Sequence, residues 1–323
     1  MRTLRYVLVV LLVGVGLAAC GSGDGGTGGK ESTAGQQART VRHAMGTTEI
    51  IGRPGRVVVL DTGELDSAIA LGVKPVGAVE AVPGAGFPDY LAEQTRGVQI
   101  VGSIEQPNLE KIAALQPDLI LSSKLRHEAI YDQLSQIAPT VFTEEVGVTW
   151  KANFRLHAEA LGRSEQAQRL MKEYEQKVAA FREAMGERLD GTTVSVVRSV
   201  GSEVRIYMRA SFIGTILEDA GLSRPKPQDK DVFSETATRE RIRDLDGQVM
   251  VLAKYGDDHQ LLEQLMGSPL WSRLRVVRDD RVYEVSDDLW FLGIGNLAAR
   301  KVVEDLHTIF VENQRLPGDA AGR

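Results

Sequence analysis

The sequence predicts an α/β fold of two Rossmann-like lobes, each with a central parallel sheet, joined by a single long α-helix. The first indication is a degenerate repeat, in which the segment 108–119 recurs about 130 positions later as 238–249. Each copy has a capping residue, a short apolar helical stripe and then a buried strand. The second indication is a segment between the copies whose apolar residues follow a purely helical period. A helix that leads into a buried strand is half of a parallel α/β unit, so two copies predict two lobes.

The N-terminus predicts a secreted protein with a lipid anchor. Residues 1–5 are basic, residues 6–16 form an apolar run too short for a stable membrane span, and residues 17–20 read Leu-Ala-Ala-Cys. The only cysteine, Cys20, directly follows this run, which is the arrangement of a lipobox. We therefore expect residues 1–19 to be a signal peptide and Cys20 to be lipidated. Residues 20–39 are rich in glycine and small polar residues, which predicts a flexible tether.

Length and charge define the remaining organisation. We expect an N-terminal α/β lobe at 40–148, a linker with the long helix at 149–190, a C-terminal α/β lobe at 191–313 and a tail at 314–323. The formal net charge is −6 and becomes about −8 when the signal peptide is removed, so nucleic acid is not an expected partner. With no second segment long enough to span a bilayer, the lipid alone would hold the protein on the extracytoplasmic face of the cell membrane.

The first lobe is predicted to alternate strands and helices. A hairpin or edge strand at 43–52 precedes it, and residues 63–71 form a helix that Gly72 closes. Short apolar runs between turn signals mark the buried strands. The expected strands are 57–60, 75–79, 99–101, 119–121 and 141–142.

The linker carries the strongest helical pattern of the chain. Apolar residues spaced by three and four positions predict one amphipathic helix at 165–188, about 24 residues and roughly 36 Å long. Gly162 would end a preceding helix, and Ser164 would cap this one. The positions of the apolar stripe are Met171, Tyr174, Val178, Phe181, Met185 and Leu189.

In the second lobe the alternation resumes. Apolar runs predict strands at 193–198, 248–252 and 282–285, and helical periods predict helices at 211–220, 261–266 and 297–310. The segment 228–234 is polar and is expected to be a loop.

Motifs of catalysis and cofactor binding are missing from the chain. There is no Gly-x-Ser-x-Gly elbow, no phosphate-binding loop and no His-Glu-x-x-His pair. The five histidines are scattered without a ligand-like spacing, which argues against a protein-bound transition metal. We therefore predict no catalytic residues, no metal site and no cofactor. A secreted lipoprotein enzyme is kept as a remote alternative.

Over residues 40–313 the sequence resembles the lipoprotein substrate-binding proteins that supply ABC importers with ferric siderophores, ferric citrate, haem or cobalamin. The resembling segments are 56–60, 71–77, 107–120, 131–140, 211–225, Trp290 and 293–300. The resemblance implies two α/β lobes joined by one long helix, a ligand cleft between the lobes, an importer permease as partner and no enzymatic activity. Residues 122–128 (Ser-Ser-Lys-Leu-Arg-His-Glu) resemble the ligand-facing loop of the subgroup for citrate-, carboxylate- or hydroxamate-based siderophores. Haem or cobalamin is the alternative cargo.

The expected ligand site lies beyond the carboxyl ends of the strands, as in other open parallel sheets. A ferric siderophore has a coordinatively saturated iron and anionic outer oxygens, so it requires guanidinium donors and aromatic faces rather than metal ligands. Arg205, Tyr207 and Arg209 share one face if their segment is extended. Solvated surface arginines are the alternative explanation. The candidate ligand-binding residues are Arg126, Lys124, Arg198, Arg205, Tyr207, Arg209, Trp290 and Tyr255.

Glu110 and Glu240 occupy equivalent positions in the two repeats. As acids in the first turn of a helix they would only favour the helix dipole. The resemblance implies a second role, in which one glutamate per lobe docks onto arginines of the membrane permease. We expect both to point away from the cleft, and we expect the protein to be a monomer.

Overall fold

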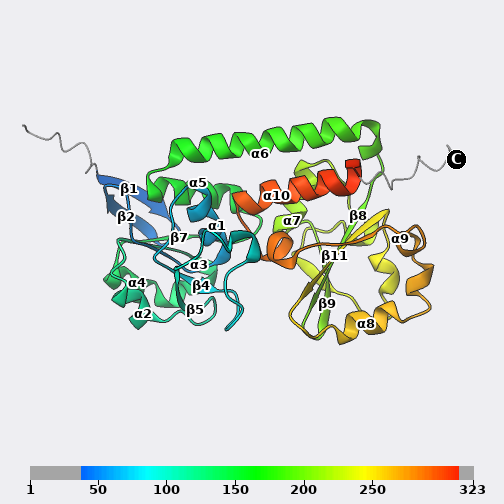
Figure 1. The fold of residues 1–323 in the computed structure, drawn as a ribbon, viewed down its shortest axis with the longest axis horizontal. Coiled ribbons are helices and arrows are strands. Elements are labelled where there is room, and N and C mark those ends of the chain that lie inside the picture. The colour runs from blue at the N-terminus through cyan, green and yellow to red at the C-terminus, as the bar shows by residue number, and fades with distance from the viewer. Residues whose placement is uncertain (1–37, 313–323) are drawn as a thin grey trace, which may run out of the picture. The chain divides into compact units, whose positions relative to one another are not determined.

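A computed structural model describes residues 38–312, so Cys20 and the predicted signal peptide lie outside the described range. Within this range no helix combines the length and the apolar character required to cross a membrane. Two five-stranded sheets, each covered by helices, form an N-terminal and a C-terminal lobe (Figure 1). The predicted fold class is confirmed.

The N-terminal lobe contains a fully parallel sheet with strand order β5-β4-β3-β6-β7. Helices α2 and α4 cover one face, and α1 and α5 cover the other (Figure 1). An antiparallel hairpin of β1 and β2 packs beside β7. The elements are β1 (Ala38–His43), β2 (Gly46–Ile51), β3 (Val57–Val59), α1 (Thr62–Ala70), β4 (Gly77–Glu80), η1 (Asp89–Leu91), β5 (Gln99–Ser103), α2 (Leu109–Ala114), β6 (Leu119–Ser123), α3 (Lys124–His127), η2 (Glu128–Ile130), α4 (Tyr131–Ile137) and β7 (Thr140–Thr143).

The C-terminal lobe has the strand order β10-β9-β8-β11-β12, with a parallel core of β8, β11 and β12. Strand β9 adds to β8 in antiparallel fashion, and β10 adds to β9 in the same way. The elements are β8 (Val194–Val200), β9 (Glu203–Tyr207), α7 (Phe212–Asp219), η4 (Lys226–Gln228), β10 (Ser234–Thr236), η5 (Ile242–Leu245), β11 (Val249–Tyr255), α8 (Gln260–Met266), η6 (Trp271–Arg273), α9 (Arg275–Arg278), β12 (Val282–Glu284), η7 (Asp288–Leu292), α10 (Asn296–His307) and η8 (Thr308–Glu312).

Two consecutive helices connect the lobes. Helix α5 (Trp150–Leu161) ends where Gly162 adopts a left-handed conformation with φ of 66°, and α6 (Ser164–Met185) follows, continued by η3 (Gly186–Leu189). The predicted long helix is therefore confirmed, and five of its six predicted apolar positions are buried. Helix α10 packs against both α6 and α1, so the last helix of the chain touches the linker and the N-terminal lobe.

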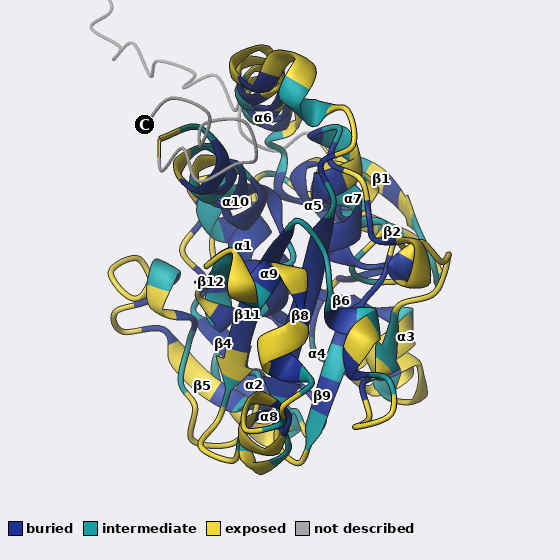
Figure 2. Cartoon of the chain, turned by 90° about the vertical axis from the view of Figure 1, so that its right-hand side faces the viewer, coloured by how far each residue is buried: buried dark blue, intermediate teal, exposed yellow. Residues whose placement is uncertain are grey.

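The buried residues form one hydrophobic core that continues through both lobes. It contains the helix-facing residues of β3 and β6 in one sheet and of β8 and β11 in the other, together with the inner faces of α1, α5, α6, α7 and α10. Two smaller clusters lie on the opposite faces of the sheets. Figure 2 shows the central strands dark blue, while the outer faces of the helices are exposed.

The segment 228–234 is mainly loop, as predicted, because residues 229–233 lie between η4, which ends at Gln228, and β10, which begins at Ser234 and pairs with β9. One local prediction in the second lobe is wrong. The helix expected after Thr238 is reduced to the 3-10 turn η5, which still buries Ile242 and Leu245. Arg241 bonds to Glu235 and Asp244, and these side chains hold the segment in a tight turn.

Candidate ligand-binding site

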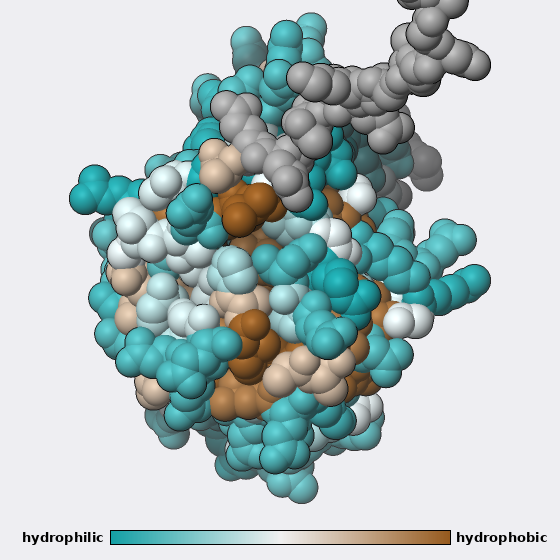
Figure 3. Space-filling view, turned by 90° about the vertical axis from the view of Figure 1, so that its left-hand side faces the viewer, coloured by the Kyte–Doolittle hydropathy of each residue, from teal (hydrophilic) through white to brown (hydrophobic). Residues whose placement is uncertain are grey.

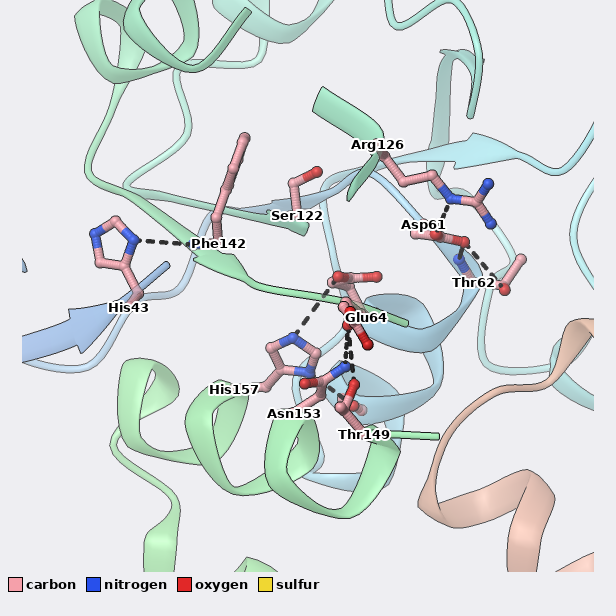
Figure 4. Close-up of polar contacts among 12 residues, drawn as sticks. His43, Asp61, Thr62, Glu64, Ser122, Arg126, Phe142, Thr149, Asn153 and His157 are labelled. Carbon is pink, nitrogen blue, oxygen red and sulfur yellow. Dashed lines mark hydrogen bonds and ion pairs between the residues drawn. The ribbon is translucent and has the colours of Figure 1, made fainter. Parts of the chain in front are cut away.

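The carboxyl end of the N-terminal sheet presents an arginine held by a buried acid. Strand β3 runs into Asp61, whose Oδ1 accepts a hydrogen bond from the N–H of Thr62 (2.7 Å) and so caps α1. Strand β6 runs into α3, where Arg126 Nε donates to Asp61 Oδ2 at 2.9 Å (Figure 4). Asp61 is 1% exposed and Arg126 is 38% exposed. Since the ion pair engages Nε, the terminal nitrogens of Arg126 are left for a second partner.

The surroundings of Arg126 fix both its position and its charge. Partial burial disfavours the charged form, but the charge and hydrogen bond of Asp61 outweigh burial and raise the pKa of Arg126. Next to it, buried His127 donates from Nε2 to the carbonyl of Ile104 (2.7 Å) and accepts at Nδ1 from the hydroxyl of Ser122 (2.6 Å). These bonds hold the short helix α3 against the lobe, so the arginine rests on a rigid support.

Lys124 is the first residue of α3 and lies, as predicted, beyond the carboxyl end of strand β6. Its Nζ is 2.9 Å from Glu144 Oε1, and both side chains are exposed. Exposed ion pairs of this kind contribute little to stability. An anionic ligand could therefore exchange with Glu144 at small cost.

In the C-terminal lobe, Arg198 is a buried structural residue. Its Nε and Nη2 donate to the two oxygens of Asp287 at 2.5 Å each, and Nη1 donates to the hydroxyl of Tyr207 at 3.0 Å. The rings of Tyr255 and Phe291 lie 5.0 and 5.1 Å from the guanidinium carbon. With every guanidinium nitrogen engaged and the residue 7% exposed, Arg198 makes its contacts inside the lobe, contrary to the prediction that it offers donors to a ligand.

The aromatic residues around Arg198 form a layered cluster. Tyr207 is buried between Phe291 and Phe233, with ring centroids 4.7 and 5.0 Å away. Tyr255 is partly exposed, whereas Phe233 is 52% exposed and forms the outer ring of the cluster. Sequence reasoning missed Phe233, although two adjacent apolar residues, Val232 and Phe233, in an otherwise polar segment were a signal that this segment carries a surface function.

Two further predicted cations, Arg205 and Arg209, are partly exposed. Arg205 lies opposite Arg198 in the β8–β9 pair, so it shares a sheet face with Arg198 and Tyr207, as the alternation predicted. Arg205 Nε is 2.8 Å from Glu203, and Arg209 Nε is 3.4 Å from Asp229. Arg209 follows the end of β9, so strand alternation does not determine the direction of its side chain.

Trp290 does not line a surface. It is 0% exposed within η7, and its Nε1 donates to Asp305 Oδ2 of α10 at 2.7 Å. The prediction that Trp290 contacts the ligand is therefore wrong for this structure. The π-helical turn rotates the indole into the core and presents Phe291 to Tyr207 instead.

Glu110 and Glu240 are both exposed. Glu110 lies in the first turn of α2, which Asn108 caps through a hydrogen bond from the N–H of Lys111 (2.9 Å), as predicted. Glu240 lies in the turn before η5, and a hydrogen bond from Thr238 lowers its pKa. Each glutamate follows the end of a strand, β5 or β10, and begins the segment that crosses over to the next strand.

The N-terminal lobe meets the end of the chain where α1 contacts the start of α10. An added Cβ on Gly63 of α1 would lie 3.1 Å from the carbonyl oxygen of Ile294, which precedes α10. Asp66 of α1 accepts hydrogen bonds from the N–H groups of Leu297 and Ala298, both at 2.9 Å, and so caps α10 across the junction. Among residues 38–312 no group of three or more His, Cys, Asp or Glu side chains could hold a metal ion.

Comparison with known proteins places these observations in a family. The periplasmic binding protein family matches residues 57–289. The probable siderophore-binding lipoprotein YfiY of Bacillus subtilis is 36% identical over 326 residues, which cover 97% of this chain and 99% of that protein. The achromobactin-binding periplasmic protein of Dickeya dadantii is 31% identical over 264 residues, 78% of this chain and 85% of that protein.

Solved structures agree with the sequence comparison. Staphylococcus aureus SirA, in a crystal structure with staphyloferrin B, is similar to this chain with a TM-score of 0.76 and 35% identity. The alignment covers 84% of this chain and 98% of SirA, so it includes both lobes and the linker. The chain belongs to the periplasmic binding protein family.

Proposed function

We propose that this protein captures a ferric siderophore on the extracytoplasmic side of the membrane and delivers it to the permease of an ABC importer. The family is one of binding proteins, and both YfiY and SirA, two of the similar proteins, are described with a siderophore. The observation that carries the proposal is Arg126, an exposed guanidinium fixed by buried Asp61 at the carboxyl end of the N-terminal sheet.

The chemistry of the exposed groups favours a citrate-, carboxylate- or hydroxamate-type siderophore. Arg126, Lys124, Arg205 and Arg209 are cations that are only partly buried, and each is matched by one acid. Anionic outer oxygens of a chelate can replace these acids and gain charge-assisted hydrogen bonds. Phe233 adds an exposed aromatic face next to Tyr207. The protein would thus bind the outer atoms of the siderophore, and the siderophore alone would coordinate the iron.

Calorimetric titration tests the proposal. The titrants are ferric citrate, a ferric citrate-hydroxamate, a ferric trihydroxamate, a ferric catecholate, haem and cobalamin. We expect binding to ferric citrate-type or hydroxamate-type chelates and none to cobalamin. Tight binding to haem or cobalamin alone would contradict the proposal. Calorimetry is preferred to tryptophan quenching because Trp150, Trp271 and Trp290 are all buried and none can contact the ligand directly.

A lipid on Cys20 is proposed to hold the protein at the membrane. The proposal is supported by the lipobox spacing and by the relatives named as lipoproteins. Cys20→Ala should release a folded protein from the membrane fraction or leave it unprocessed. A variant that still fractionates with membranes after signal removal would refute the anchor.

Glu110 and Glu240 are proposed to dock onto the permease, one from each lobe. The proposal is supported by their exposure and by their equivalent places at the start of the two crossovers. Replacing both with arginine should abolish siderophore-dependent uptake while ligand affinity in solution stays unchanged. Glu183→Arg with Glu187→Arg, on the linker, is the matched control and should transport normally. Normal uptake by the Glu110/Glu240 variant would refute the docking role.

The free receptor is proposed to be a monomer. On the face shown in Figure 3 hydrophobic side chains occur in separate patches among hydrophilic ones. Extended apolar patches are typical of stable interfaces between subunits. Light scattering at micromolar concentration should give the mass of one chain, and a dimer mass would refute this part of the proposal.

A further inference from the structure

A buried acid and a buried histidine face each other just behind the Asp61–Arg126 pair. Glu64 of α1 and His157 of α5 are each 2% exposed, with Glu64 Oε1 3.8 Å from His157 Nε2. This distance is too long for a direct hydrogen bond. Glu64 Oε2 and His157 Nε2 have no hydrogen-bond partner among the described residues. Figure 4 shows Glu64 between His157 and the Asp61–Arg126 pair.

These two side chains border a small, partly open cavity at the junction of the lobes. The cavity, of about 10 Å³, is lined by α1, by α5 and by Ile294 from the segment before α10. A volume of this size holds about one water molecule. His157 Nδ1 is also 2.9 Å from the hydroxyl of Ser67. The cavity is therefore lined by polar groups and lies one helical turn behind the ligand-facing edge of α1.

The charge state of Glu64 depends on its burial and on the charges of Asp61 and Arg126. Burial, together with the charge of Asp61, raises the pKa of Glu64 to about 8, and the charge of Arg126 acts in the opposite direction. Burial lowers the pKa of His157 to about 3, so the histidine is neutral near pH 8. The titratable or charged groups on the elements packed around Glu64 are Asp61 and Asp66 of α1, Glu80 of β4, Arg126 of α3, His157 of α5 and Arg300 of α10.

Only two of these groups can change the charge around Glu64 when a ligand binds. Asp66 is fixed by the N-terminus of α10 and by the hydroxyl of Tyr90 (2.9 Å). Glu80 accepts from the N–H of Gly86 at 3.0 Å. Asp61 and Arg126, in contrast, form the pair that a ligand must enter. Above pH 8, where Glu64 is ionised, one arginine in the free protein therefore offsets the charges of two acids, Asp61 and Glu64.

We propose that Glu64 takes up a proton when an anionic ligand engages Arg126, so that ligand capture is coupled to protonation of this buried carboxyl. This inference rests on the proposed function. The ligand competes with both acids for the single positive charge and adds negative charge near them. Both carboxylate oxygens of Asp61 are engaged, by the N–H of Thr62 and by Arg126, whereas Glu64 Oε2 has no partner among the described residues, so Glu64 is the acid that takes up the proton.

The coupling has a definite sign. A ligand that prefers the protein with neutral Glu64 raises the pKa of Glu64 above its value of about 8. Proton uptake is therefore small at pH 6.5, where Glu64 is already mostly neutral, and reaches about 0.3–0.4 proton per ligand at pH 8. Affinity falls as the pH rises through 8, by about three- to tenfold, which corresponds to a pKa shift of about 0.5 to 1 unit.

Calorimetry at pH 8, in two buffers with different ionisation enthalpies, measures this proton uptake. The probe is the ferric complex of staphyloferrin B, and the variants are wild type, Glu64→Gln and the exposed control Glu183→Gln. Wild type and control should take up about 0.3–0.4 proton more per ligand than Glu64→Gln. Protons that the chelate itself exchanges cancel in this comparison. Equal proton counts in wild type and Glu64→Gln would overturn the inference.

A second measurement does not depend on the ligand. Infrared pH titration of the free protein identifies the Glu64 carboxyl band by its loss in Glu64→Gln, and the band should disappear near pH 8. A Glu64 that is already ionised at pH 6 would overturn the inference. In the calorimetric experiment, a normal binding heat with equal proton counts rejects the coupling alone. No binding heat with this chelate or with any of the other ferric siderophores titrated rejects the proposed function and the coupling with it.

Discussion

At the scale of single residues, the state of Arg126 is set by Asp61, which lies 65 positions away along the chain. The sequence indicates that both residues follow strands, and strand ends meet at one edge of a parallel sheet. It does not reveal that Asp61 is buried and bonded to Nε. That bond orients the guanidinium and leaves its two terminal nitrogens available for a ligand. An ordinary surface arginine has no such bond and is not held in one orientation.

Replacing Arg126 should therefore affect both binding and stability. Arg126→Ala removes the charged donor and should weaken siderophore binding about ten- to a hundredfold, the range of a charge-assisted hydrogen bond. It also leaves the carboxylate of Asp61 buried without its cation, so the melting temperature of the free protein should fall. Adding Asp61→Asn, which still caps α1, should restore stability but not affinity. Arg169→Ala on α6 is the control. Unchanged affinity in Arg126→Ala would remove this residue from the site.

Glu64 predicts a pH dependence of stability. Its pKa is about 8 in the folded protein and 4.5 in a model peptide, so its contribution to stability is complete below pH 4.5 and is lost as the pH rises to 8. As the pH rises across this window, the free energy of unfolding of Glu64→Gln should therefore increase relative to that of wild type, by on the order of 3–5 kcal/mol. His157, with a pKa lowered to about 3, affects stability between pH 6.5 and about 3 in both proteins, so its contribution cancels in the difference between them. Denaturant titrations at pH 4.5 and 8.5 measure the difference, and parallel pH profiles would contradict the prediction.

At the scale of elements, periodicity predicted most of the fold. Helix α6 was predictable because its stripe of buried residues repeats over many turns, so one misjudged position changes little. Strand β10 was not, because a three-residue edge strand depends on pairing with Tyr207 and its neighbours in β9 rather than on its own pattern. The same limit applies to Trp290, since the π-helical turn η7 that buries its indole has no periodicity of its own.

The start of α10 shows how one element joins the lobes. Gly295, which directly precedes the helix, lies so close to Asp66 that an added Cβ would overlap its carboxylate. Gly295→Ala should therefore push Asp66 away from the N–H groups of Leu297 and Ala298 and cost about 1–3 kcal/mol of stability. Gly55→Ala, with no atom within 4 Å of the added Cβ, should change stability by less than about 0.5 kcal/mol. Equal unfolding free energies for the two variants would show that the cap does not hold α10.

At the scale of the whole molecule, one hydrophobic core passes through both lobes and the linker. Such a core, together with the Asp66 cap, restricts how far the lobes can separate. The two-lobe architecture was predictable because it follows from repeated units and connection rules. The roles of individual site residues were harder to predict from the sequence. Arg198 and Trp290 have the chemistry of ligand contacts but are used inside the protein, and only their packing distinguishes them from Arg126.

The position of the iron tests most directly whether a ferric chelate binds between the lobes. Crystals grown with the ferric complex of staphyloferrin B allow anomalous difference maps at the iron absorption edge. We expect one iron peak beside Arg126, with the cluster of Tyr207 and Phe233 on its other side and no protein atom coordinating the metal. An iron peak far from Arg126, or one coordinated by protein side chains, would contradict this site.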